Sequence, residues 1–92
     1  MKGRRDETAL MHDVLRLITD NEATRTRIKT RCNLNFESTV RIINKLIQQE
    51  LIVRESMAGR VTYKATEKGY RVLTQLVALS YLTGEEHTRG YV

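Results

Sequence analysis

The sequence predicts a mainly α-helical fold with one small β-hairpin. Two observations predict it. Four segments have the apolar spacing of helices. Between the third and the fourth of these helical segments, two short segments in which apolar and polar residues alternate flank a turn that contains a glycine. With 92 residues the chain is too short for a second hydrophobic core, so we expect a single domain. Its expected parts are a loose basic tail (1–5), a core (6–66), a last helix (67–82) and a second tail (83–92).

The composition is that of an ordinary folded protein, with 40% apolar and 29% charged residues. Cys32 is the only cysteine, which excludes an internal disulfide or a cysteine-rich zinc site and favours a reducing, cytoplasmic location. The start, MKGRRDET, has positive charge without the apolar segment of a signal peptide, and no apolar run approaches the ~20 residues of a membrane span. We therefore expect no membrane partner.

The first helix is expected to begin after Asp6, a suitable N-cap, with Glu7 in the first turn, where the helix dipole favours an acid. It is expected to end near Asp20–Asn21. Its apolar residues share one side and are Leu10, Met11, Val14, Leu15, Leu17 and Ile18. The following Glu22–Ala23 also fits a very short strand, a point that the sequence leaves open.

Thr24 is a good N-cap for a second, short helix that ends near Arg31. Only Ile28 and Cys32 give this helix an apolar edge, so it depends on its neighbours for stability. Basic residues flank that edge on both sides: Arg25, Arg27, Lys29 and Arg31. Asn33-Leu34-Asn35 then forms a turn, in which Leu34 fills the angle between the helices and Asn35 caps the next one.

The third helix starts at Phe36 and has the clearest pattern of the chain. Its expected core face consists of Phe36, Thr39, Val40, Ile43, Leu46 and Ile47, with Ile42 at the edge. Its opposite face carries polar side chains that suit the edges of bases: Glu37, Ser38, Arg41, Asn44, Lys45, Gln48 and Gln49.

The hairpin follows the third helix. Leu51–Glu55 is expected to be its first strand, with Leu51 and Val53 on one face. Ser56–Gly59 is the expected turn, with a glycine for a positive φ, and alternation over Val61–Ala65 predicts the returning strand.

Thr66 is a suitable cap for the last helix, and Gly84 follows its expected end. Apolar side chains cover about 200° of this helix, more than one small domain covers from one side. One arc, with Tyr70, Leu73 and Val77, is expected to face its own domain. We expect the other arc to bind a second copy of the chain, through Val72, Leu76 and Leu79. Alternatively, the first helix covers both arcs.

Positive charge is concentrated in Ala23–Lys45. This segment holds six basic residues and one acid, so it carries the whole formal charge of +5, and the rest of the chain is neutral. The sequence pI is 9.7. Two helices joined by a tight turn within a basic segment are typical of a helix-turn-helix that binds nucleic acid.

Three helices, a hairpin and a further helix follow the order of a winged helix-turn-helix. Four motifs add to this order: Thr26-Arg27-Ile28, the turn Asn33-Leu34, the helix from Phe36, and Thr66-Glu67-Lys68-Gly69. Through them, residues 10–82 resemble the small basic archaeal winged-helix DNA-binding proteins. The resemblance implies a protein that binds double-stranded DNA without enzymatic activity. It also implies a homodimer through the last helix, although this helix is shorter here than in the relatives with a long coiled coil.

We therefore expect a transcriptional regulator whose third helix enters the major groove. The expected contacts of the recognition helix are Asn35, Glu37, Ser38, Arg41, Asn44, Lys45 and Gln48. The expected phosphate contacts are Arg25, Arg27, Lys29 and Arg31, and those of the wing are Arg54, Arg60 and Lys64. The same residues also fit a merely solvated surface.

Three other functions stay open: a protein that coats chromatin without sequence preference, a protein-interaction winged helix that does not bind DNA, and RNA binding. The concentrated charge disfavours the second, and the scarcity of aromatic residues for stacking disfavours the third. The sequence shows no residue set typical of catalysis, and we expect no enzyme, cofactor or metal site. His12 is expected on a helix surface, and Cys32 in plain packing rather than in redox sensing.

Overall fold

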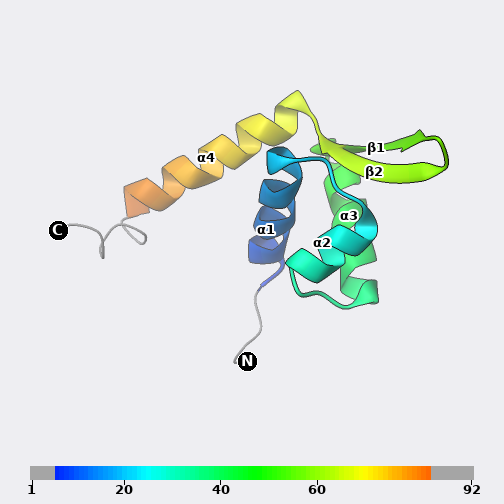
Figure 1. Cartoon of the computed structure of the whole chain (residues 1–92). Helices are drawn as coiled ribbons and strands as arrows, with labels where there is room; N and C mark the ends of the chain where they lie inside the picture. Colours follow the sequence, from blue (N-terminus) through cyan, green and yellow to red (C-terminus); the bar gives the residue numbers. More distant parts are fainter. Residues whose placement is uncertain (1–5, 84–92) are drawn as a thin grey trace.

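The computed structural model describes residues 6–83, and the side chains as far as Gln75. In this part of the chain the elements follow the predicted order (Figure 1). The helices are α1 (Glu7–Asp20), α2 (Arg25–Arg31), α3 (Phe36–Gln48) and α4 (Glu67–Thr83), and the strands are β1 (Ile52–Met57) and β2 (Arg60–Ala65). The expected tails, residues 1–5 and those after Thr83, lie outside the described residues.

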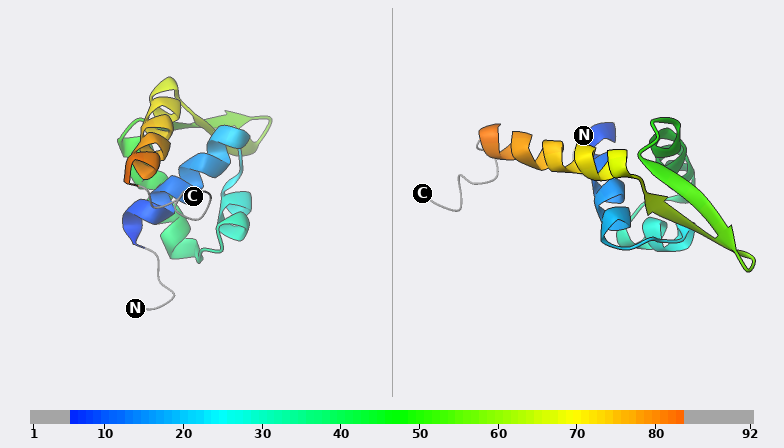
Figure 2. Two further views of the ribbon diagram at one scale, coloured as in Figure 1. Left: turned by 90° about the vertical axis from the view of Figure 1, so that its left-hand side faces the viewer. Right: turned by 90° about the horizontal axis from the view of Figure 1, so that it is seen from above.

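One hydrophobic core is enclosed by α1, α2 and α3 and completed by the inner face of the hairpin. Its most deeply buried side chains come from all of these elements and include Val14, Leu15, Ile18, Ile28, Ile42, Leu46 and Ile52. Burial of each such side chain contributes ~1.5–3 kcal/mol to stability. The first turns of α4 pack against α1, and Figures 1 and 2 show its later turns extending away from the core. No helix within the described residues is both long and apolar enough to cross a membrane.

The first three helices begin where the sequence predicts, because a polar side chain caps each of them. Asp6, Thr24 and Asn35 each accept a hydrogen bond from the backbone N–H three residues later, at donor–acceptor distances of 2.8, 3.2 and 2.7 Å. Each cap contributes ~1 kcal/mol. These local bonds fix where the chain enters each helix.

The ends of α2 and α3 share one arrangement, in which a residue in the left-handed region precedes an apolar residue. Asn33 (φ 54°) lets the Leu34 N–H return to the Lys29 carbonyl at 2.9 Å. In the same way, Glu50 (φ 62°) lets the Leu51 N–H return to a carbonyl in the last turn of α3. Such Schellman motifs satisfy the last carbonyls of a helix and turn the chain sharply. The predicted tight turn between α2 and α3 is therefore confirmed.

The first strand is shifted relative to the prediction. β1 begins at Ile52, because Leu51 takes part in the turn that ends α3. Ile52 is buried, whereas Val53 is 42% exposed. The prediction that Leu51 and Val53 share a face of the strand is therefore wrong. The strand and its buried face begin with Ile52, so Val53 points to the opposite, exposed face.

The strands of the hairpin also run further than predicted. Met57 pairs with Arg60, so the turn consists of Ala58 and Gly59 (φ 53° and 79°) instead of the four predicted residues. Two positive φ values are typical of a type I′ turn, whose twist matches that of the flanking strands.

The strand character of Ala23, which the sequence left open, is limited to one isolated bridge with Tyr63 of β2. The Tyr63 N–H donates to the Ala23 carbonyl at 2.8 Å, and the Ala23 N–H donates to the Tyr63 carbonyl at 3.1 Å. This bridge places the start of α2 beside the hairpin.

The helix α3 is rotated about its axis relative to the predicted orientation. Ile42, predicted at the edge, is fully buried, whereas Phe36, predicted in the core, is 56% exposed. The reason is that α3 contacts α1 on one side as well as α2 and β1, so its buried centre shifts toward Ile42 and Leu46. As a consequence, the edge with Arg41 and Lys45 turns toward α1.

Thr66 and Gly69 join the start of α4 to the end of α3. The Thr66 Oγ1 accepts from the Gly69 N–H at 3.0 Å and donates to the Glu50 carbonyl at 2.7 Å. A Cβ at Gly69 would overlap the carbonyl oxygen of Leu51, which accepts from the Thr66 N–H. These contacts give the Thr66-Glu67-Lys68-Gly69 motif a structural role.

Candidate nucleic-acid interface

The free face of α3 carries most of the predicted recognition residues. Glu37, Arg41, Asn44 and Gln48 are exposed and follow one another at spacings of three and four residues, so they form one row along the helix. This row presents a carboxylate, a guanidinium and two amides, which are groups that hydrogen-bond the edges of bases in a major groove. The helix thus offers hydrogen-bond donors and acceptors on a single face.

Asn35 and Ser38, which were also predicted to contact DNA, lie at the start of α3. The Asn35 Oδ1 accepts from the Ser38 N–H, and the Ser38 side chain is half-buried. The amide nitrogen of Asn35 takes no part in this bond and keeps its two N–H donors. Asn35 therefore has a structural role, and its amide N–H groups remain compatible with the predicted contact.

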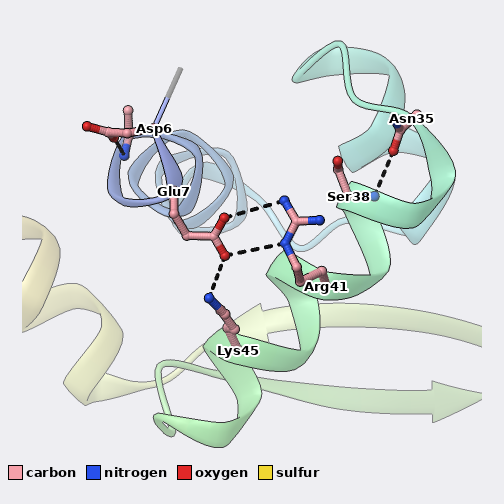
Figure 3. A network of polar contacts seen from close by, with 7 residues as sticks. Asp6, Glu7, Asn35, Ser38, Arg41 and Lys45 are labelled. Atoms are coloured by element: carbon pink, nitrogen blue, oxygen red, sulfur yellow. Dashed lines mark hydrogen bonds and ion pairs between the residues drawn. The ribbon is translucent and has the colours of Figure 1, made fainter. Parts of the chain in front are cut away.

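The cations Arg41 and Lys45 both bind the carboxylate of Glu7, which lies in the first turn of α1 (Figure 3). The Lys45 Nζ lies 2.6 Å from Glu7 Oε2, and the Arg41 Nε and Nη2 each lie 3.4 Å from one carboxylate oxygen. The hydrogen bond from Lys45, followed by those from Arg41, holds the pKa of the Glu7 carboxyl below its usual range. The sequence predicts only a helix-dipole role for Glu7. Its contact with Arg41 could not be predicted, because the two residues are 34 positions apart and no spacing rule relates them.

The four basic residues of α2 are all exposed, and one of them has an aromatic neighbour. The guanidinium carbon of Arg25 lies 5.1 Å from the centre of the Phe36 ring, which is within the range of a cation–π interaction. Phe36 therefore supports a basic side chain at the surface instead of filling the core. This role is visible only once the rotation of α3 is known.

Arg25 and Arg54 come together in a polar groove between the start of α2 and the hairpin. The groove has a volume of about 410 Å³ and is lined by Thr24, Arg25, Thr26, Arg54, Val61 and Tyr63. Guanidinium groups bind phosphate oxygens in a bidentate manner, and threonine hydroxyls donate to them. The groove thus unites one predicted phosphate contact with one predicted wing contact, whereas the other basic residues of α2 do not line it.

The three basic residues of the wing are divided between the two faces of the hairpin. Arg54 lies opposite Tyr63 in the strand register, on the inner face. Arg60 and Lys64 occupy the alternate positions, so their side chains project from the outer face. All three are exposed, but they do not form one continuous basic surface.

The predicted dimer residues are described in part. Val72 packs partly against the core of its own domain. Tyr70, expected to cover that domain, is 50% exposed and donates from its hydroxyl to the Thr19 carbonyl at 3.3 Å. The side chains of Leu76 and Leu79 lie outside the described part of the structure.

His12 is less exposed than the sequence predicts. Its Nε2 is buried without a hydrogen-bond partner, and His12 is one of the residues that line a cavity of about 240 Å³ between α1, the end of α3 and α4. Cys32 is buried at the end of α2, in agreement with its predicted packing role. Among residues 6–83, no group of three or more His, Cys, Asp or Glu lies close enough together to hold a metal ion.

Residues 4–83 match the family model of the winged helix-turn-helix. The chain therefore belongs to the winged helix-turn-helix family, in agreement with its helix order and its two-stranded antiparallel wing. No curated protein matches the chain in sequence.

Several solved structures are similar to this chain. A protein of unknown function from Listeria innocua is 27% identical, with a TM-score of 0.78, over 95% of this chain and 63% of its own. The transcriptional regulator BldR from Sulfolobus solfataricus is 19% identical, with a TM-score of 0.77, over 88% of this chain and 61% of its own. The DNA-binding protein Sso10a-2 from the same organism is 19% identical, with a TM-score of 0.76, over 91% of this chain and 87% of its own. The chain thus spans less than two thirds of the length of the first two.

Proposed function

We propose that this chain binds double-stranded DNA as a homodimer and acts as a transcriptional regulator. The observation that carries the proposal is the groove that Arg25 of α2 and Arg54 of the wing both line, with Arg25 also stacked on Phe36 at the start of α3. Membership of the winged helix-turn-helix family supports it. So do the descriptions of BldR as a transcriptional regulator and of Sso10a-2 as a DNA-binding protein.

In the proposed complex, α3 lies in the major groove and the row that includes Arg41 and Asn44 faces the bases. Arg25 and Arg54 bind a phosphate in their shared groove, next to the start of α3. The remaining basic residues bind further phosphates and are Arg27, Lys29, Arg31, Arg60 and Lys64. For each phosphate that a cation neutralises, the slope of log affinity against log salt concentration becomes steeper by ~0.9.

The homodimer forms, in this proposal, through the part of α4 that extends away from the core (Figures 1 and 2). Leu76 and Leu79 lie in that part, and a two-fold axis there would place two α3 helices ~34–36 Å apart on successive turns of the major groove. Light scattering at tens of micromolar tests this step. A monomeric mass would contradict it, as would an unchanged dimer mass after Leu76→Asp combined with Leu79→Asp.

Fluorescence anisotropy on a mixed-sequence duplex across a salt series tests the DNA binding. We expect tight binding at ~50 mM salt with a steep slope. Arg25→Gln combined with Arg54→Gln should lower both the affinity and the slope, and Arg41→Ala combined with Lys45→Ala should lower the affinity. Arg16→Gln is the matched control, because Arg16 is exposed on the side of α1 away from its buried residues.

The outcomes separate the proposal from its alternatives. Equal affinity for duplexes of different sequence would favour a protein that coats chromatin. Absence of binding by the wild type at ~50 mM salt, where phosphate contacts are strong, would favour a protein-interaction winged helix.

A further inference from the structure

We propose that Glu7 is a positioning residue that determines the base specificity of Arg41. Its carboxylate holds one edge of the guanidinium group and leaves the other edge free for a guanine. The inference rests on the proposed DNA binding and adds a specificity determinant from α1, a helix outside the helix-turn-helix.

The geometry of the contact shows which edge of Arg41 is occupied. The Nε and Nη2 face the two carboxylate oxygens of Glu7, each at 3.4 Å. Figure 3 shows the third guanidinium nitrogen, Nη1, on the side away from Glu7. Because Nη2 carries two N–H groups, one of them can face Glu7 while the other stays available next to Nη1.

The free end of the guanidinium is the part that recognises guanine. Its two nitrogens form the bidentate pair with O6 and N7 that is the most common specific contact of arginine in the major groove. An unsupported arginine side chain has several rotatable bonds and also reaches phosphates. A carboxylate on the Nε edge fixes the plane of the guanidinium, and with it the direction of the free end.

Lys45 keeps the Glu7 carboxylate in place. Its Nζ lies 2.6 Å from Glu7 Oε2, which is the shortest contact in the network of Figure 3. The backbone of Glu7 is fixed as well, because Asp6 caps the helix at this point. Lys45 therefore acts through Glu7 in this proposal, and it need not contact a base itself.

Stability of the fold does not account for the network. The side chains of Arg41 and Glu7 are 48% and 34% exposed, and ion pairs this accessible to water add little to stability. Next to DNA the same contacts lose much of their water, so their directional effect on Arg41 becomes stronger.

Glu7 has two opposite effects on DNA binding. As a carboxylate beside two cations, it weakens the attraction to phosphates of any sequence. As a support for Arg41, it strengthens the preference for one base. Loss of its charge should therefore raise the affinity for mixed-sequence DNA and lower the selectivity, a combination that a purely structural residue would not produce.

The test compares the wild type with Glu7→Gln, Arg41→Lys and the control Glu67→Gln. Glu67 is an exposed acid in the first turn of α4, so its substitution removes the same charge from the same position of a different helix, whereas Arg41 and Lys45 pair with Glu7. Each protein first selects from a pool of randomised duplexes, which is then sequenced. Anisotropy then gives its affinity for the selected duplex, for the duplex with the preferred guanine replaced, and for a mixed-sequence duplex.

We expect the wild type to select a guanine that Arg41→Lys no longer selects. In Glu7→Gln the preference for this guanine should fall about fivefold, the factor that one net hydrogen bond contributes to an equilibrium. The affinity for the mixed-sequence duplex should rise about two- to fivefold, with a salt slope steeper by up to ~0.9. Glu67→Gln should keep the preference of the wild type.

Each other outcome rejects a defined part of the argument. An unchanged guanine preference in Glu7→Gln, or a loss of preference in Glu67→Gln as well, would overturn the positioning role while DNA binding stands. A wild type that binds tightly but selects no base would overturn it too. A wild type that binds no duplex at ~50 mM salt would overturn the proposed function itself.

Discussion

The close approach between α4 and the end of α3 predicts that Gly69→Ala destabilises the fold. In most helices this change stabilises by ~1 kcal/mol, because alanine is the better helix former. Here the new Cβ would overlap the Leu51 carbonyl oxygen, so α4 or the backbone at Leu51 has to move. Such overpacking costs ~1–3 kcal/mol, and loss of the hydrogen bond from Thr66 N to Leu51 O adds ~1 kcal/mol.

The net expectation for Gly69→Ala is a loss of ~1–3 kcal/mol in the free energy of unfolding. For a domain of this size, each ~1 kcal/mol lowers the Tm by ~4–8 °C. Thermal and urea unfolding, followed by circular dichroism at one protein concentration, measure both quantities. Lys68→Ala is the control, because it is the exposed neighbour in the same helical turn and should change stability by less than ~0.5 kcal/mol. A Gly69→Ala protein as stable as the wild type would refute the steric argument.

Three further predictions concern the core, a helix end and the Glu7 network. Ile28→Ala should lower the free energy of unfolding by ~2–5 kcal/mol in urea titrations, since Ile28 is fully buried, and a loss below ~1 kcal/mol would show that α2 packs loosely. Glu50→Gly should raise it by ~0.5–1 kcal/mol, because φ is 62° there, and a decrease would contradict strain at this turn. In carboxyl NMR titrations, Lys45→Met should raise the pKa of Glu7 toward its usual value, and an unchanged pKa would count against the Lys45 contact. Because the folded-state pKa of Glu7 is lowered, the contribution of its network to stability is present at neutral pH and is lost as the pH falls through that pKa.

The sequence by itself determined the order of the elements and most of their ends. Local chemistry is sufficient for this: Asp6, Thr24 and Asn35 cap their own helices with bonds to residues three positions away. The tight turn at Asn33 follows from an equally local pattern. The helical period also placed the polar row of α3 on a free face, and those predicted contacts remain predictions for DNA.

The tertiary structure decided the orientation of the elements. The rotation of α3 depends on α1, α2 and β1 packing around it together, which the period of one helix does not encode, so Phe36 and Ile42 were assigned to the wrong environments. Which residues of β1 face the core depended on Leu51 taking part in the turn that precedes the strand. In both cases the local sequence pattern was compatible with more than one buried face. Packing against side chains from distant segments decided which face is buried.

The contacts on which both proposals rest are also tertiary. Arg25 and Arg54 line one groove, and Glu7 binds Arg41 and Lys45, only because helices and strands far apart in the sequence pack side by side. The sequence determined that positive charge gathers in Ala23–Lys45, since charge is a sum over residues. Which of these charges face a common groove, and which are held by an acid, depends on distances across the fold, because electrostatic interactions and hydrogen bonds act through space.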